Sequence, residues 1–392
     1  MQNSRGWLQE FQYFRAVAII EVIVIHATLT VYLTGVETLN LQKDIIIGFF
    51  AFTSFAVPHF VLISGVVLYN KYSDSFSLST FYKKRFSAVL PEYLFWFTFY
   101  SVWLYAGAAL YTSVFHRSTT HYGSIPSVAQ YLTGYLTGLV TGSYVFFVLL
   151  IMQLYLLYPF LVKFYNRFAR KKNPLFVLSL LLFVQIVYVS FFVTRVPPAL
   201  YYNALFLSMI FYFVLGFFIS EHFETIRQTI SGVSKKSLSL AVVLSTIYYA
   251  VVFYHTILLS SSPPVYFWLY QLTAPFYCLI LVVFYLRIAI WWGEPHGFFT
   301  SSMEKIGENS FGIYLTVPIF TTAFTYVLPE VGLTWNNLLF YPTWVLLVLT
   351  FSYVSVRVLS HLPLSNITVG PARKPQVSHT PAPKQASGPR PP

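Results

Sequence analysis

The stretch FRAVAIIEVIVIHA, residues 14–27, decides the fold, because it is an uninterrupted apolar segment that carries three ionisable side chains. A charge near the centre of a membrane helix costs about 3 kcal/mol on insertion scales, so ionisable residues there are candidates for function. On a helix, the eleven-residue spacing of Arg15 and His26 places them within about 20° of one another and about 16 Å apart along the axis. Glu21 projects about 120–140° away from that face. The stretch therefore predicts a membrane helix with a cation and an imidazole on one face.

The composition excludes an ordinary soluble domain. Of the 392 residues, 57% are hydrophobic and only 9% are charged, against about 25% charged residues in soluble proteins. A polytopic, all-α membrane protein is expected. The single cysteine, Cys278, excludes an intrachain disulfide and a Cys-clustered metal site. We expect no metal and no permanently bound cofactor.

Apolar runs of about 20 residues are long enough to cross a bilayer as helices. The sequence contains ten such runs, near residues 11–33, 45–69, 87–110, 143–164, 174–194, 200–220, 238–258, 266–290, 309–328 and 336–360. With the N-terminus in the cytoplasm, most Lys and Arg residues fall in inside segments and the outside keeps only Lys43, Arg117 and Arg195. The positive-inside rule then predicts about ten transmembrane helices with both termini cytoplasmic. This asymmetry accounts for the net charge of +12 by the orientation of the protein in the lipid bilayer. The charge therefore does not imply a nucleic-acid partner.

Two segments differ from the apolar runs in composition. Residues 1–363 are predicted to form the transmembrane domain, and residues 364–392, rich in Pro, Ser, Ala and Lys, a disordered cytoplasmic tail. The longest outside loop, about 111–142, is polar and rich in Tyr. It is either a cap that contacts an acceptor such as a sugar, or a simple connector.

The Arg15 and His26 pair is the strongest chemical candidate. An imidazole titrates near neutral pH and can take the proton of a hydroxyl that attacks a thioester. Arg15 would lie at the cytoplasmic mouth and hold a phosphate or carbonyl of a donor. The alternative is a structural role, in which both side chains satisfy backbone carbonyls or pair with Glu21 or Glu92.

A basic cluster is the second candidate. Lys84 and Arg85 belong to FYKKRFSAVLPEYLFW, residues 81–96, where Glu92 follows inside the predicted helix and can pair with Arg15. Such a cluster is a topology determinant or lipid-headgroup contact, or a docking site for the phosphates of a nucleotide-type donor.

The remaining pocket candidates are polar or small residues inside apolar runs. Ser64 and Gly65 interrupt residues 58–72, which favours close backbone approach, and a structural role for nearby His59 is at least as plausible as a chemical one. Gln153 and Tyr155 are polar groups in residues 144–161 that form interhelical hydrogen bonds or line a channel, and Tyr314 is expected to point inward.

These motifs, in this order, resemble the acyltransferase-3 family of integral-membrane O-acyltransferases. The family's signature is an Arg, ten residues and then a His, and Arg15 and His26 resemble it. Four further family motifs across residues 8–360 resemble the stretches FVLISGVVL, YKKRFSAVLPEY, FVLLIMQLYLLYPFL and SFGIYL. Glu21 stands where the family generally has an apolar residue, and Val317 stands where a late histidine is usual.

The resemblance implies transfer of an acyl group, usually acetyl, from cytoplasmic acyl-CoA to a hydroxyl of an extracytoplasmic carbohydrate. His26 would be the acid/base, Arg15 the donor-facing cation, and Arg85 with Lys84 the donor-side cluster. The expected location is a cell membrane, as a multi-pass protein, most naturally the bacterial cytoplasmic membrane. The alternative function is a transporter or flippase that exports a glycan or its lipid-linked precursor.

Overall fold

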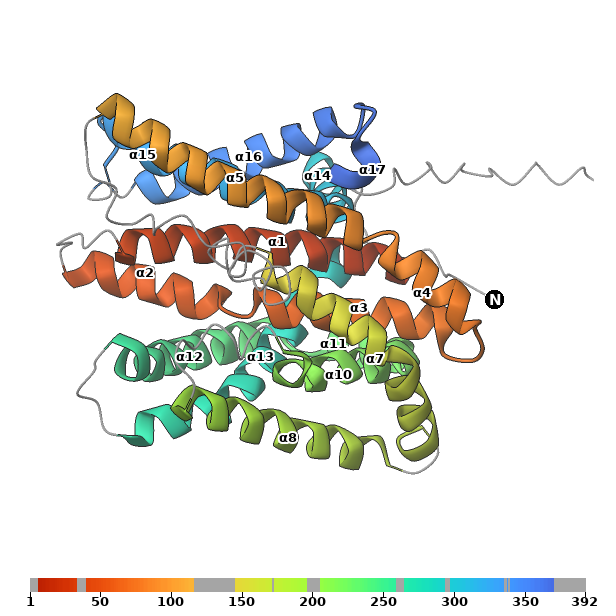
Figure 1. Ribbon diagram of the computed structural model, residues 1–392. Coiled ribbons are helices and arrows are strands. Elements are labelled where there is room, and N and C mark those ends of the chain that lie inside the picture. The colour runs from red at the N-terminus through yellow and green to blue at the C-terminus, as the bar shows by residue number, and fades with distance from the viewer. Residues whose placement is uncertain are drawn as a thin grey trace, which may run out of the picture.

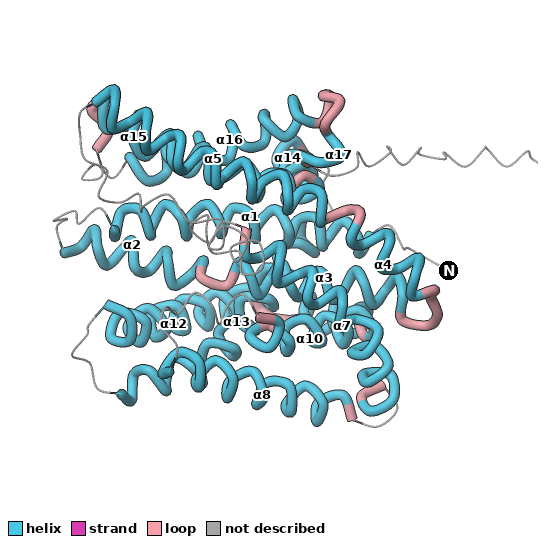
Figure 2. Tube along the Cα trace, viewed as in Figure 1, coloured by secondary structure: helices cyan, strands magenta, loops and turns pink. Residues whose placement is uncertain are grey.

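The computed structural model describes residues 6–33, 40–115, 145–170, 173–195, 205–258, 264–292, 297–334, 337 and 339–369. Helices joined by turns make up this part of the chain, and it contains no strand (Figure 2). The predicted all-α class is therefore confirmed. The predicted outside loop lies almost wholly in residues 116–144, outside the described residues.

Eight helical segments among the described residues are long and apolar enough to cross a membrane. They are α1 (Gly6–Leu33), α2 (Asn40–Thr53) together with α3 (Ala56–Tyr72), α7 (Phe146–Phe168), α8 (Pro174–Arg195), α12 (Lys235–Phe253), α13 (Pro264–Trp292), α15 (Ser310–Glu330) and α16 (Phe340–Leu359). Each matches one of the predicted runs. The other two runs contain α5 (Leu90–Phe115) and the shorter apolar helix α10 (Ile210–Glu221). The predicted orientation of the termini stays a prediction.

The run predicted as one span over 45–69 is two helices, because the chain turns at Ser54 and Phe55 between α2 and α3. The Ser54 hydroxyl donates to the carbonyl of Ala51 at 2.9 Å, and the amide of His59 donates to the carbonyl of Phe55 at 2.9 Å. Pro58 lies in the first turn of α3, where a missing N–H costs least. Irregular backbone at membrane depth is tolerated only where protein buries it, and Phe55 is buried.

Short helices that the sequence did not reveal surround the long ones. They are α4 (Leu78–Phe86), the 3-10 turn η1 (Phe206–Ser208), α11 (Phe223–Gly232), the π-helical turn η2 (Tyr254–Leu258), α14 (Phe298–Glu308) and α17 (Ser365–Thr368). α4 and α17 lie toward the end of the bundle that holds the N-terminus (Figure 1). The basic cluster therefore belongs to a separate helix, α4, and not to the start of α5.

α1 occupies the centre of the bundle. It contacts α2, α3, α13, α14, α15 and α16, and it lies between the group formed by α5, α15 and α16 and the group formed by α10, α12 and α13 (Figure 1). Its side chains are buried or half-buried from Gln9 to Thr28. Any polar group on α1 is therefore placed among other helices.

The C-terminal helix α17 lies within the segment predicted as a tail. The indole N–H of Trp96 on α5 donates to the carbonyl of Thr368 at 2.7 Å, and α17 packs against α5. The ordered part of the chain thus includes residues 365–369, and residues 370–392 lie outside the described residues.

The crossing of α3 and α10 depends on two glycines. A Cβ atom on Gly65 would meet the carbonyl oxygen of Phe213, and one on Gly216 would meet the carbonyl oxygen of Leu62. Small residues let helix backbones approach closely in membrane bundles. The predicted role of Gly65, close backbone approach, is the one that the structure gives it.

We predict that Gly65→Ala lowers the stability of the bundle, because the new methyl group meets backbone that cannot rotate away. Overpacking of this kind costs about 1–3 kcal/mol. The matched control is Gly48→Ala on α2, where a Cβ would have no neighbour within 4 Å. Thermal unfolding of the detergent-solubilised variants is the measurement, and equal midpoints for the two would contradict the prediction.

Candidate active site

Residues predicted from five separate stretches of sequence meet at one cavity of about 260 Å³. Arg15 comes from α1, Ser64 from α3, Arg85 from α4, Tyr155 from α7 and Tyr314 from α15, and all five line this cavity. We call it the arginine cavity. Ala88 and Val89, between α4 and α5, complete its wall on the side of the basic cluster.

Arg85 places a guanidinium group without an ion-pair partner among the described residues in the arginine cavity. It lies in the last turn of α4, where the helix dipole favours a cation. Its guanidinium carbon lies 5.1 Å from the ring centroid of Tyr72 and 6.0 Å from that of Tyr155. Its buried Nε–H donates no hydrogen bond to any described residue, and no described carboxylate pairs with the guanidinium. Such a cation is suited to bind an anion that enters the cavity.

Arg15 brings a second guanidinium group to the arginine cavity. Its Nη1 donates to the Oε1 of Gln12, one turn earlier on α1, at 3.4 Å. The end of α14 reaches the same place because Gly307 packs directly on the backbone of Gln12, where a Cβ would meet the Gln12 carbonyl oxygen. This contact explains why α14 and α15 contribute to the cavity that α1 lines.

Two polar residues that line the arginine cavity were not predicted as site residues. Glu308, the last residue of α14, is exposed at the edge of the arginine cavity, and Ser310, the first residue of α15, is buried in its wall. The only signal in the sequence was the motif GENSFGIYL around them. The turn between α14 and α15, which brings them to the same cavity as Arg15, is a tertiary feature.

His26 lies on the continuous helix α1, half-buried, and is not among the lining residues of the arginine cavity. Because α1 is helical from residue 6 to residue 33, the predicted geometry holds: His26 shares the face of Arg15, about 16 Å further along the axis. A donor held at Arg15 must therefore extend along α1 to reach the imidazole.

Glu21 lies on a different side of α1, and both of its carboxylate oxygens have a side-chain partner. Its carboxylate accepts a hydrogen bond from the Tyr285 hydroxyl at 2.7 Å, and its other oxygen lies 2.7 Å from Nδ1 of His59. Both side chains of the Glu21–His59 pair are buried, and His59 packs between the rings of Phe14 and Tyr285. From the sequence, only Arg15 and His26 were candidate partners of Glu21, because His59 and Tyr285 are distant along the chain.

Four further predicted site residues lie outside the arginine cavity. Glu92 is buried and neither of its carboxylate oxygens hydrogen-bonds to a described residue, so the expected pair with Arg15 is absent. The Oε1 of Gln153 accepts a hydrogen bond from the amide of Phe206 at 3.2 Å, which is the interhelical alternative. Lys84 is exposed beside Arg85 and is not a lining residue, and Gly65 faces α10.

Comparison with known proteins agrees with this architecture. An acyltransferase domain model matches residues 8–357, so the chain belongs to the acyltransferase-3 family and is a multi-pass membrane protein. A relative in Bacillus subtilis (strain 168), named "Putative membrane-bound acyltransferase YfiQ", is 24% identical over 225 residues, which are 55% of this chain. The match spans 57% of that relative's length. No solved structure matches the chain.

We predict that Glu21 and His59 are strongly coupled in stability. Removing one partner of a buried charged pair costs about 3–5 kcal/mol, whereas replacing both by apolar residues is often neutral. Glu21→Leu and His59→Leu should each lower the thermal unfolding midpoint, and the double variant should lose less than the sum of the two. A double-mutant cycle measures this, and additive losses would contradict the coupling.

Proposed function

We propose that the protein transfers an acyl group, most simply acetyl, from cytoplasmic acyl-CoA to a hydroxyl of an extracytoplasmic carbohydrate. The observation that carries the proposal is the arginine cavity. Two guanidinium groups, Arg15 and Arg85, line one cavity in a chain of the acyltransferase-3 family.

The donor suits this cavity by charge. The phosphates of acyl-CoA are anions, and arginine binds phosphate with paired, charge-assisted hydrogen bonds. Tyr72 and Tyr155 lie close to the guanidinium of Arg85, so the side chain is held against two rings while its polar edge stays available. Arg85 therefore binds the phosphates, and Arg15 orients the part of the donor that enters the bundle.

The length of acyl-CoA also matches the spacing of Arg15 and His26. Acyl-CoA carries its thioester at the end of a long, thin arm, away from its phosphates. Arg15 and His26 share one face of α1 and are about 16 Å apart along it. A donor anchored at the arginine cavity can extend along this face and present its thioester near the imidazole.

The reaction then needs one base. The His26 imidazole removes the proton of the acceptor hydroxyl as its oxygen attacks the thioester carbonyl carbon. The new C–O ester bond forms, the C–S bond breaks, and the thiolate of CoA takes the proton from the imidazolium. Positioning the hydroxyl and the thioester together supplies much of the rate.

The proposal predicts that His26→Ala removes acyl esters from the surface glycan while glycan export continues. A general base contributes about 10²- to 10⁴-fold to a rate, so ester content should fall at least about 100-fold at matched membrane levels. Ester analysis and glycan quantification in the same cells are the measurements. Loss of the glycan itself would favour the transporter alternative, and unchanged ester content would exclude His26 as the base.

A second prediction concerns the donor. Arg85→Gln should raise the KM for acyl-CoA about 10- to 100-fold, because a hydrogen bond to a charged group contributes about 1.5–3 kcal/mol. The matched control is Lys84→Gln, its exposed neighbour outside the cavity, which should change KM less than about threefold. Equal effects of the two substitutions would mean that the arginine cavity does not hold the donor.

A further inference from the structure

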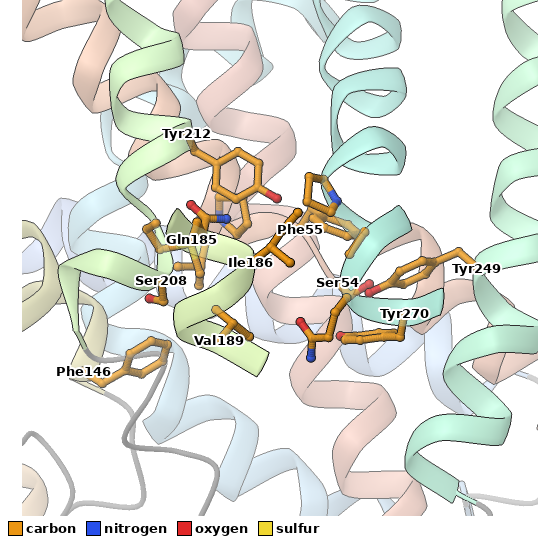
Figure 3. A pocket seen from close by; sticks show the side chains of 16 residues that line it. Ser54, Phe55, Phe146, Gln185, Ile186, Val189, Ser208, Tyr212, Tyr249 and Tyr270 are labelled. Atoms are coloured by element: carbon orange, nitrogen blue, oxygen red, sulfur yellow. The ribbon is translucent and has the colours of Figure 1, made fainter. Parts of the chain in front are cut away.

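A second cavity, of about 200 Å³, lies beside the first turn of α3 at Val57 and Pro58, whereas the arginine cavity is lined by α3 residues from Phe60 onward. It is bounded by the break between α2 and α3, by α8, by η1 with the start of α10, and by α12 and α13. Figure 3 shows Gln185 and Ser208 facing this space from one side and Tyr249 and Tyr270 from the other. We call it the amide cavity.

The amide cavity is polar but carries no charge on any of its described lining residues. Its polar lining consists of hydroxyl and carboxamide groups, those of Ser54, Gln185, Ser208, Tyr212, Tyr249, Tyr270 and Gln271. The arginine cavity, in contrast, has two cations and a carboxylate. A charged ligand would lose its hydration in the amide cavity without gaining a counter-charge, so an uncharged ligand is favoured.

Gln271 is the side chain that indicates a ligand. It is only 8% exposed, it lines the amide cavity, and its carboxamide makes no hydrogen bond to any described residue. Leu272, the next residue on α13, is 48% exposed on the outer surface of the bundle. Because the carboxamide lines the cavity and has no hydrogen bond within the described residues, Gln271 is available to a group that donates and accepts hydrogen bonds.

The other polar groups of the cavity are held in place by the protein. Oε1 of Gln185 accepts from the amide of Phe211 at 3.1 Å, and the hydroxyls of Ser208 and Ser54 donate to backbone carbonyls at 2.7 and 2.9 Å. These three side chains are therefore held in fixed positions in the wall of the cavity. Binding pockets commonly combine such a preformed apolar and aromatic wall with a few placed polar groups.

The tyrosine side chains of the amide cavity indicate which class of uncharged ligand fits it. The rings of Tyr249 and Tyr270 lie 5.4 Å apart at 30°, and Tyr249 stacks on Tyr277 at 4.7 Å. A sugar ring presents C–H groups on its face and hydroxyls around its edge, which match an aromatic wall and a carboxamide that both donates and accepts. The volume equals that of about six or seven waters at roughly 30 Å³ each, which is enough for one sugar ring.

We propose that the amide cavity is a subsite that holds one uncharged sugar unit of the acceptor, with Gln271 hydrogen-bonded to its hydroxyls. This inference rests on the proposed function. With the predicted orientation, α13 begins at the outer face, and Gln271, seven residues after Pro264, lies about 10 Å below that end. Phe60 and Phe147 line the arginine cavity and pack together at 5.7 Å, whereas Pro58 and Phe146 line the amide cavity. Adjacent residues thus line the two cavities, so the sugar unit held here would lie apart from the phosphates of the donor.

The test is direct binding of simple glycosides to the full-length protein in lipid nanodiscs, which avoids detergents with sugar headgroups. The probes are methyl glycosides of neutral hexoses, 6-deoxyhexoses and N-acetylhexosamines, with methyl glucuronide as the charged comparison. Binding is measured as the rise in the unfolding temperature with probe concentration. We expect a neutral glycoside to bind wild type at least tenfold more tightly than Gln271→Met, which keeps the length of the side chain without its amide.

Leu272→Ala is the matched control and should bind the glycoside as wild type does. The subsite is overturned if no neutral glycoside binds, if Gln271→Met binds equally well, or if the charged glycoside binds as tightly. Because no donor is present, these outcomes are separate from the failure of the proposed function. Absence of acyl transfer by a wild type that binds the glycoside through Gln271 would overturn the proposed function and leave a glycan-binding site.

Discussion

The hydrogen bonds that join Glu21 to His59 and Tyr285 determine how α1 sits in the bundle. Glu21 is buried at membrane depth, where a carboxylate without partners is very unfavourable, and its two partners lie on α3 and α13. α1 therefore cannot rotate about its axis without breaking both contacts. Arg15, on the face about 120–140° away, consequently lines the arginine cavity with residues of α3, α7 and α15.

α3 then borders two chemically different spaces. Ser64 faces the arginine cavity, whereas Gly65, the next residue, lets α10 pack against α3. At the other end of α3, the break after α2 opens the amide cavity beside Pro58. The proposed charged donor and uncharged acceptor unit would require these two environments.

The long helices and much of the arginine cavity were predictable from the sequence, for different reasons. Apolar runs of spanning length identify membrane helices because the bilayer forces the backbone to satisfy its own hydrogen bonds. Arg15, Arg85 and Tyr155 were found because polar side chains inside or next to such runs are costly and are kept for a purpose. The break at Ser54 and Phe55, the helix α14 and the partners of Glu21 were not predictable, because each depends on contacts between residues far apart in the chain. The sequence also suggested that Glu92 pairs with Arg15, but the tertiary structure does not form this pair.

The account depends most on the placement of the acyl donor between Arg85 and His26. A cryo-electron microscopy structure of the full chain in nanodiscs with a non-transferable thioether analogue of acetyl-CoA tests it directly. The account predicts phosphate density within hydrogen-bonding distance of the Arg85 guanidinium, with the sulfur atom on the side of α1 that carries His26. Phosphate density away from the arginine cavity, or a sulfur atom on the Glu21 side of α1, would contradict it.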